Sequence, residues 1–269
     1  MKDRNKMLQG KTALITGSGQ NIGKAIALLF ASSGANVVIN GHRNREAIEK
    51  VAQQARDLGS QAIAVMADIS DPDAVQKMVD VSIEKFGTVD IVVSNAAIRP
   101  RQAFLDISIE DWHRVINTNL SSAFYLARAT LPSMKANQWG RIIHISGYDG
   151  FVGAPHRAHN VTCKGGIHAL SKAIAMEFGP YGITVNTVSP GTIDTSRIAE
   201  DYLNLESKYQ LLKKIIPLRR LGTCEEVAET CLYLASDASS FVTGQVIHVN
   251  GGSLMLSCHL PSDSNLIEN

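Results

Sequence analysis

Hydrophobic residues occur along this chain in short runs that alternate with longer amphipathic stretches. The short runs are rich in β-branched residues and almost free of charge, which is typical of strands buried on both faces. They occupy residues 12–16, 36–40, 62–68, 89–96, 140–146, 183–190 and 245–252. The stretches between them repeat with helical periodicity, and several end in Gly, a helix stop signal. The predicted helices cover residues 21–34, 45–59, 73–87, 111–137, 163–182 and 223–237.

Strands that alternate with helices predict right-handed crossovers and a parallel sheet. We therefore expect one doubly wound α/β domain of Rossmann type over residues 1–269, with helices on both faces of the sheet. The segment 192–221 is more polar and irregular, and we interpret it as a lid over the substrate. The residues after about 253 follow no clear pattern and are expected to form a mobile tail.

Composition excludes several classes of protein. The net charge is +1 and the basic residues are scattered, so no nucleic-acid-binding surface is indicated. The four cysteines form no CxxC pair and suit no zinc site, so we expect free thiols and no bound metal. The N-terminal stretch is charged, and no apolar run is long enough to span a bilayer. The expectation is a cytoplasmic protein without a membrane partner.

A glycine-rich turn follows the first predicted strand and opens the first predicted helix. In this stretch, TGSGQNIGKAIA (16–27), Gly17, Gly19 and Gly23 let the backbone turn tightly and approach a pyrophosphate. The N-terminus of the following helix offers free N–H groups and a positive dipole end to the phosphates. The turn therefore predicts dinucleotide binding.

The same stretch resembles the TGxxxGxG fingerprint of the short-chain dehydrogenase/reductase family. Further motifs that are similar to the family's follow in order, so that the resemblance spans roughly residues 8–253: ADIS (67–70), SNAA (94–97), NTNLSS (117–122), SPGTIDT (189–195) and TGQVIHVNGG (243–252). Asn21 stands at the family's middle glycine, and because Asn tolerates a positive φ we expect the loop shape to be kept.

The resemblance implies a bound nicotinamide dinucleotide. The second strand ends in Gly41, without the carboxylate that favours NAD, and His42 and Arg43 follow it. NADP is therefore favoured over NAD, which stays possible. The residues that the resemblance assigns to the cofactor are Gly17, Ser18, Gly19, Asn21, Ile22, Gly23, His42, Arg43, Asp68, Ile69, Asn95, Ala96, Lys164, Pro190, Gly191, Ile193 and Thr195.

The family's reaction uses a Tyr, a Ser, a Lys one helical turn after the Tyr, and an Asn. Here Lys164 and Asn119 match the Lys and the Asn, but Asn160 stands at the Tyr position and Gly147 at the Ser position. Asn160 can orient a carbonyl or a water but cannot titrate near neutral pH. Ser146 is adjacent to Gly147, and in an extended strand it should face the other way.

Three nearby residues are candidates for a relocated proton donor. His156 lies four residues before Asn160, so it would share a helix face with it if the helix extended that far back. Tyr148 is the only phenol close to the predicted site, and His159 is adjacent to Asn160. We expect one of these three side chains to contact substrate. Cys163 is expected to be a packed core thiol.

Three functions are compatible with this set of residues. Family resemblance favours an NADP(H)-dependent oxidoreductase acting on a small carbonyl or alcohol with an atypical proton donor. The changed Tyr and Ser positions keep open a non-redox enzyme on the same scaffold, such as a lyase, a hydratase or a carbon–carbon cleaving enzyme, or a catalytically silent partner subunit. The resemblance also implies a homodimer or homotetramer, with apolar stripes at residues 123–131 and 167–178 as its contact surface.

Overall fold

The computed structural model describes residues 6–196 and 205–255. Within these residues seven strands form one parallel sheet, as predicted, and their order is β3-β2-β1-β4-β5-β6-β7. The strands are β1 (Thr12–Ile15), β2 (Asn36–Gly41), β3 (Ala62–Met66), β4 (Ile91–Ser94), β5 (Gly140–Ile145), β6 (Ile183–Pro190) and β7 (Val246–Val249).

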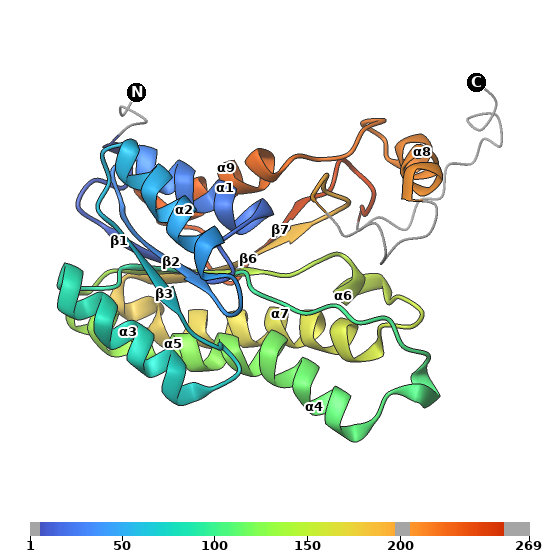
Figure 1. Cartoon of the computed structure of the whole chain (residues 1–269), viewed down its shortest axis with the longest axis horizontal. Coiled ribbons are helices and arrows are strands. Elements are labelled where there is room, and N and C mark those ends of the chain that lie inside the picture. The colour runs from blue at the N-terminus through green and yellow to red at the C-terminus, as the bar shows by residue number, and fades with distance from the viewer. Residues whose placement is uncertain (1–5, 197–204, 256–269) are drawn as a thin grey trace.

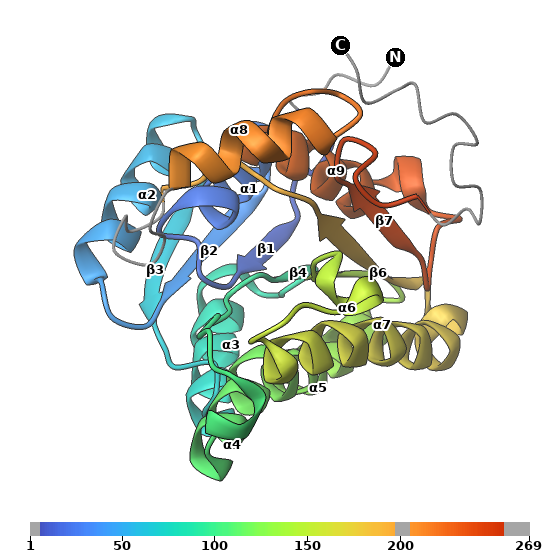
Figure 2. The ribbon, with the colours of Figure 1, turned by 90° about the vertical axis from the view of Figure 1, so that its right-hand side faces the viewer.

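Helices cover both faces of the sheet (Figures 1 and 2). One layer contains α1 (Asn21–Ser32), α2 (Arg45–Asp57) and α9 (Cys224–Ala235); the opposite layer contains α3 (Pro72–Phe86), α5 (Ser122–Ala136) and α7 (Ala158–Phe178). The described chain also forms α4 (Ile109–Ile116), α6 (Asp149–Val152) and α8 (Leu205–Ile215). None of the helices in the described residues is long and apolar enough to cross a membrane.

The core lies in two apolar layers, one on each side of the sheet. On β5, Ile143 and Ile145 pack with α1 and α9, whereas Ile142 packs with α5 and α7. Successive strand residues point to opposite faces, so a strand covered on both sides needs apolar residues throughout. This requirement explains why the strand runs of the sequence lack a polar face.

The helix boundaries differ from the predicted ranges at two places that matter for the site. The predicted helix 111–137 is interrupted by a π-helical turn at Asn117–Ser121, which separates α4 from α5. The predicted helix 163–182 begins earlier, at Ala158, and ends at Phe178. Periodicity did not reveal the first turn of α7 because its residues are mostly polar. The predicted lid contains α8, and its residues 197–204 lie outside the described residues, as does most of the predicted tail.

The functional end of the sheet follows from the strand order. β1 and β4 are neighbours although two strands and three helices separate them in the sequence. The chain therefore winds outward in opposite directions from this pair, and in doubly wound sheets ligands bind in a crevice beyond the carboxyl ends of such strands. At this end of the sheet the segment after β1 contacts the segments after β4 and β6, at Ala96 and Ser196.

Candidate functional site

The glycine turn after β1 is closely packed against its neighbours. A Cβ atom on Gly17, whose φ is +62°, would lie 2.9 Å from Ala96. A Cβ atom on Gly23 would lie 2.4 Å from the Gly17 carbonyl oxygen and 2.6 Å from Asn95 Nδ2. No side chain fits at either position, so the backbone stays open toward the crevice while α1 packs directly against the loop.

Asn21 has the left-handed conformation predicted for it, with φ at 49°. Its side chain also binds the segment after β6. Asn21 Oδ1 accepts hydrogen bonds from the Ser196 N–H at 3.0 Å and from Ser196 Oγ at 2.8 Å. The Asn therefore connects the glycine turn to the base of the predicted lid, a contact that a Gly at this position could not make.

Side-chain hydrogen bonds fix the glycine turn to the ends of β2 and β4. Asn95 Nδ2 donates to the carbonyls of Thr16 at 2.9 Å and Gly17 at 3.2 Å. Asn40 Oδ1 accepts from the Gly17 N–H at 3.3 Å, and the Asn40 N–H donates to Ser18 Oγ at 3.0 Å. Ser18 and Asn95, both predicted at the cofactor site, thus hold the loop with their side chains. Sequence reasoning missed Asn40, whose only signal was a polar residue at the end of an apolar run.

The residues predicted to face the adenosine half lie together after β2 and β3. His42 and Arg43 are exposed, and His42 Nε2 lies 3.6 Å from Asp68 Oδ2. Asp68 accepts hydrogen bonds from the N–H and the hydroxyl of Ser70 at 2.9 and 2.7 Å. Partial burial opposes ionisation, but the Ser70 hydrogen bonds and the charges of His42 and Arg43 together lower the pKa of Asp68. Next to Asp68, Ile69 is buried.

The turn after β6 is anchored on both sides. The Gly191 N–H donates to the Val249 carbonyl at 2.9 Å, and a Cβ on Gly191 would lie 2.7 Å from Asn250. Ile193, which is buried, pairs with Gly222 in an isolated bridge. Pro190, Gly191 and Ile193 are therefore fixed in place after β6, and Thr195 follows them; their contact with the nicotinamide stays a prediction from the resemblance.

Asn119, Asn160 and Lys164 meet where α7 faces the π-helical turn. Asn119 lies in that turn and donates from Nδ2 to Asn160 Oδ1 at 3.1 Å. Asn160 and Lys164 are one helical turn apart on α7, and all three side chains are buried. The register inferred for the Lys and Asn positions is consistent with this arrangement.

Lys164 is held against the end of β5. Its Nζ donates to the Ile145 carbonyl at 2.9 Å. Burial, followed by the positive charge of Arg99, lowers the pKa of Lys164 to about 8. Sequence reasoning missed Arg99, which lies two residues after the motif at 94–97.

The space beside Gly147, which is predicted to stand at the family's Ser position, is open, because a Cβ there would meet no atom within 4 Å. The neighbouring Ser146 continues the strand alternation and faces α7, where its Oγ lies 2.6 Å from His168 Nε2. Burial, followed by the charge of His248, lowers the pKa of His168 to about 4. Ser146 and His168 therefore pair as neutral groups beside Lys164, and sequence reasoning did not anticipate this pair.

The three candidate proton donors have different surroundings. His156 is not on α7, since the helix begins at Ala158; it is exposed in a left-handed turn with φ at 62°, so the shared helix face did not form. Tyr148 is partly exposed and directly precedes α6. His159 is fully buried: its Nδ1 accepts from the Asn160 N–H at 2.8 Å and its Nε2 lies 3.1 Å from Gln102 Oε1.

Both ring nitrogens of His159 are therefore hydrogen-bonded to other groups of the protein. Gln102 in turn donates to Asp111 Oδ2 at 2.6 Å, which extends a hydrogen-bonded chain to the surface of α4. Burial lowers the pKa of His159, so the ring is neutral near pH 7. Cys163 is completely buried, and burial raises the pKa of its thiol to about 11, which confirms the expected core position.

A parallel sheet with a glycine turn at the switch point defines a Rossmann-type α/β protein. The family profile described as enoyl-(acyl carrier protein) reductase matches residues 17–253. The chain belongs to the short-chain dehydrogenase/reductase family, as its motifs predicted.

Individual relatives are similar over nearly the whole chain. The 3-oxoacyl-(acyl-carrier-protein) reductase FabG of Staphylococcus aureus is 38% identical over 249 residues, which are 93% of this chain and 100% of the relative. The L-rhamnose 1-dehydrogenase (NAD(P)(+)) of a Sphingomonas species is 37% identical, covering 92% of this chain and 97% of the relative. A solved structure from Agrobacterium tumefaciens, described provisionally as a gluconate dehydrogenase, has a TM-score of 0.88 and 32% identity over 95% of this chain and 100% of its own.

Proposed function

We propose that the chain is an NADP(H)-dependent oxidoreductase of short-chain type that acts on a small carbonyl or alcohol substrate with an atypical proton donor. One observation carries the proposal: the chain combines a closely packed glycine turn after β1 with a buried Lys164 and a buried Asn119, while Asn160 and Gly147 stand where the resemblance places the family's Tyr and Ser. The relatives named above carry oxidoreductase names, which supports the reaction class.

The residues present fit a nicotinamide dinucleotide. The missing Cβ atoms of Gly17 and Gly23 keep backbone N–H groups at the N-terminus of α1 accessible to a pyrophosphate. Lys164 and the anchored turn at Pro190–Thr195 would hold the nicotinamide riboside. A bound nicotinamide would exchange a hydride with the substrate carbon, and the protein's own task is then to move a proton at the substrate oxygen.

The preference for NADP rests on the end of β2. A Cβ on Gly41 would lie 2.7 Å from Ile48 Cγ2, so the carboxylate that NAD favours does not fit there without movement. His42 and Arg43 follow in an exposed position that suits a 2′-phosphate. Arg43→Ala should weaken NADPH binding about tenfold or more and leave NADH binding nearly unchanged.

The matched control is Arg45→Ala, because Arg45 is a neighbouring exposed arginine that pairs with Glu49 at 3.6 Å. Both variants are titrated with NADPH and NADH by nucleotide fluorescence. Equal losses for the two nucleotides, or equal losses in the two variants, would contradict a phosphate-binding Arg43.

The reaction class is tested by following nicotinamide absorbance with a panel of ketones, aldehydes and alcohols. Substrate consumption without an absorbance change would favour the non-redox alternative, to which the non-titrating Asn160 lends some support. Binding of cofactor without any turnover would favour the silent subunit. The variant carrying Gly147→Ser and Asn160→Tyr should raise ordinary reductase activity, since a Cβ atom at 147 meets no neighbour within 4 Å.

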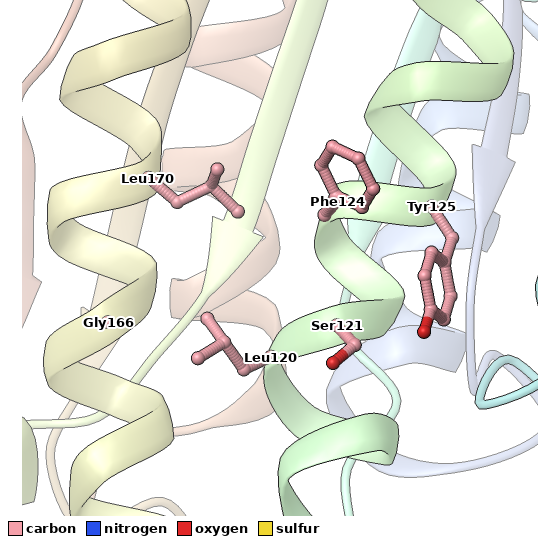
Figure 3. A pocket seen from close by; sticks show the side chains of 6 residues that line it. All are labelled: Leu120, Ser121, Phe124, Tyr125, Gly166 and Leu170. Atoms are coloured by element: carbon pink, nitrogen blue, oxygen red, sulfur yellow. The ribbon is translucent and has the colours of Figure 1, made fainter.

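We also infer that the chain forms a homo-oligomer through α5 and α7. An open, mainly apolar groove of about 530 Å³ lies between these helices and is lined by Leu120, Ser121, Phe124, Tyr125, Gly166 and Leu170 (Figure 3). The Phe124 side chain is 49% exposed there. An apolar groove on two long, roughly parallel helices suits the same surface of a second copy.

A further inference from the structure

The backbone of Ile98 determines the orientation of the Asn160 side chain, because Asn119 binds both residues. Asn119 Oδ1 accepts from the Ile98 N–H at 2.9 Å, and Asn119 Nδ2 donates to the Ile98 carbonyl at 2.7 Å. A carboxamide that binds both the N–H and the C=O of one residue has only one possible orientation. If the Asn119 amide were reversed, its NH₂ group would face the Ile98 N–H and its oxygen would face the Ile98 carbonyl oxygen. The second N–H of Asn119 therefore points at Asn160, whose oxygen must be the acceptor at 3.1 Å.

This orientation turns the amide N–H groups of Asn160 away from Asn119. Within the part of the chain that the structure describes, Asn160 Nδ2 has no hydrogen-bond acceptor. It does not belong to the polar atoms that are both completely enclosed by protein and without a hydrogen-bond partner. Asn160 is thus a fixed donor at the position of the family's phenol. A substrate carbonyl, or the alkoxide that develops from it, is an oxygen that such a donor binds.

Lys164 lies one helical turn further along α7, on the same face. In the described residues its ammonium group makes one hydrogen bond, to the Ile145 carbonyl at 2.9 Å, which leaves two of its three N–H groups for other partners. No hydroxyl is available at Gly147, and both ring nitrogens of His159 are used elsewhere. Unlike His159, Lys164 therefore has N–H groups left with which to give a proton to a bound substrate.

We propose that Lys164 itself donates and accepts the proton at the substrate oxygen, and that Asn160, oriented by Asn119, holds this oxygen through its amide N–H. The inference rests on the proposed oxidoreductase function. In reduction the carbonyl carbon receives the hydride, the C=O π pair moves to oxygen, and oxygen takes a proton from the Lys164 ammonium. The resulting amine regains its proton from water, and the reverse sequence oxidises an alcohol.

The surroundings of Lys164 suit an acid that works near neutral pH. Its pKa of about 8 means that a sizeable fraction of each form is present between pH 7 and 9. Burial and Arg99 lower this pKa, Cys163 and Asp149 oppose the shift, and the lysine's own charge acts on His144 and His168. Reduction by the wild-type protein should therefore slow as the pH rises through about 8.

The first experiment compares Lys164→Met and Lys164→Ala with Lys172→Met, an exposed lysine two turns further along α7. For both Lys164 variants we expect a loss in kcat of about 10²–10⁴-fold and no pH transition near 8. NADPH binding is measured separately by fluorescence, and circular dichroism checks the fold. Methylamine should restore part of the Lys164→Ala rate, and across a series of small amines the restored rate should vary with the pKa of the amine, which an amine that only binds the ribose would not produce.

The second experiment uses Asn160→Asp, which keeps an acceptor for Asn119 but removes the N–H groups. The rate should fall about 10²–10³-fold, as for loss of an oxyanion donor. The new carboxylate one turn from Lys164 should move the pH transition upward. A Lys164→Met protein that binds NADPH and keeps the transition near pH 8, or a folded Lys164→Ala protein without amine rescue, overturns the inference. A wild-type protein without turnover overturns the proposed function, and the inference with it.

Discussion

Gly23→Ala tests whether the glycine turn is as closely packed as the structure indicates. The new methyl group would lie 2.4 Å from the Gly17 carbonyl oxygen and 2.6 Å from Asn95 Nδ2. This is roughly 1 Å closer than such atoms ordinarily approach. The carbonyl belongs to the backbone, and Asn95 is held by its bonds to Thr16 and Gly17, so neither can rotate aside cheaply.

The size of the effect follows from two contributions. Overpacking costs about 1–3 kcal/mol, and a displaced Asn95 amide loses hydrogen bonds that contribute about 1 kcal/mol each. We expect the free energy of unfolding to fall by about 2–4 kcal/mol, which lowers Tm by roughly 4–16 °C in a domain of this size. The displaced loop should also weaken NADPH binding at least tenfold, equivalent to about 1.4 kcal/mol.

Calorimetry measures Tm, and titration with NADPH measures affinity. The matched control is Gly147→Ala, whose methyl group meets nothing within 4 Å and should change stability by less than about 1 kcal/mol. If Gly23→Ala melts within about 2 °C of the wild type and binds NADPH equally well, the packing described for this loop is wrong.

Three further changes probe other parts of the molecule. Asn21→Val should destabilise the protein by about 1–3 kcal/mol in urea unfolding, because a β-branched residue is strained at a φ of 49°, whereas Asn21→Gly should be much milder; equal losses would refute the conformational explanation. Burial lowers the pKa of His144 to about 4, so the unfolded chain takes up a proton between pH 6.5 and 4 that the folded chain refuses, and stability is lost as the pH falls through this window. His144→Leu should therefore flatten that loss by up to about 3 kcal/mol between pH 7 and 4, and an unchanged pH slope would count against a buried neutral imidazole. Phe124→Glu should dissociate the oligomer in light scattering, whereas Leu58→Glu, at a similarly exposed apolar residue outside the groove, should not; a wild-type monomer would rule out the proposed α5–α7 contact.

The sequence by itself determined the layered fold and the glycine turn that is proposed to bind the cofactor. A strand covered on both faces must be apolar throughout, and a turn that approaches a phosphate needs glycine, so both features are visible as residue types at fixed spacing. The positive φ of Asn21 was also predictable, because few other residues accept it. These are local requirements of the backbone.

Only the tertiary structure decided the arrangement at the catalytic end. The sequence predicted that Asn160 and Gly147 stand at two family positions, but not that Asn119 fixes the direction of the Asn160 amide through the backbone of Ile98. It suggested His156 on a helix face, whereas the helix begins two residues later. It gave no sign that Ser146 pairs with His168, since hydrogen bonds between residues 22 positions apart depend on how strand and helix pack. The direction in which a buried amide points and the protonation of a buried lysine depend on neighbours in space. Those neighbours are far away in the sequence, so a local sequence pattern does not reveal them.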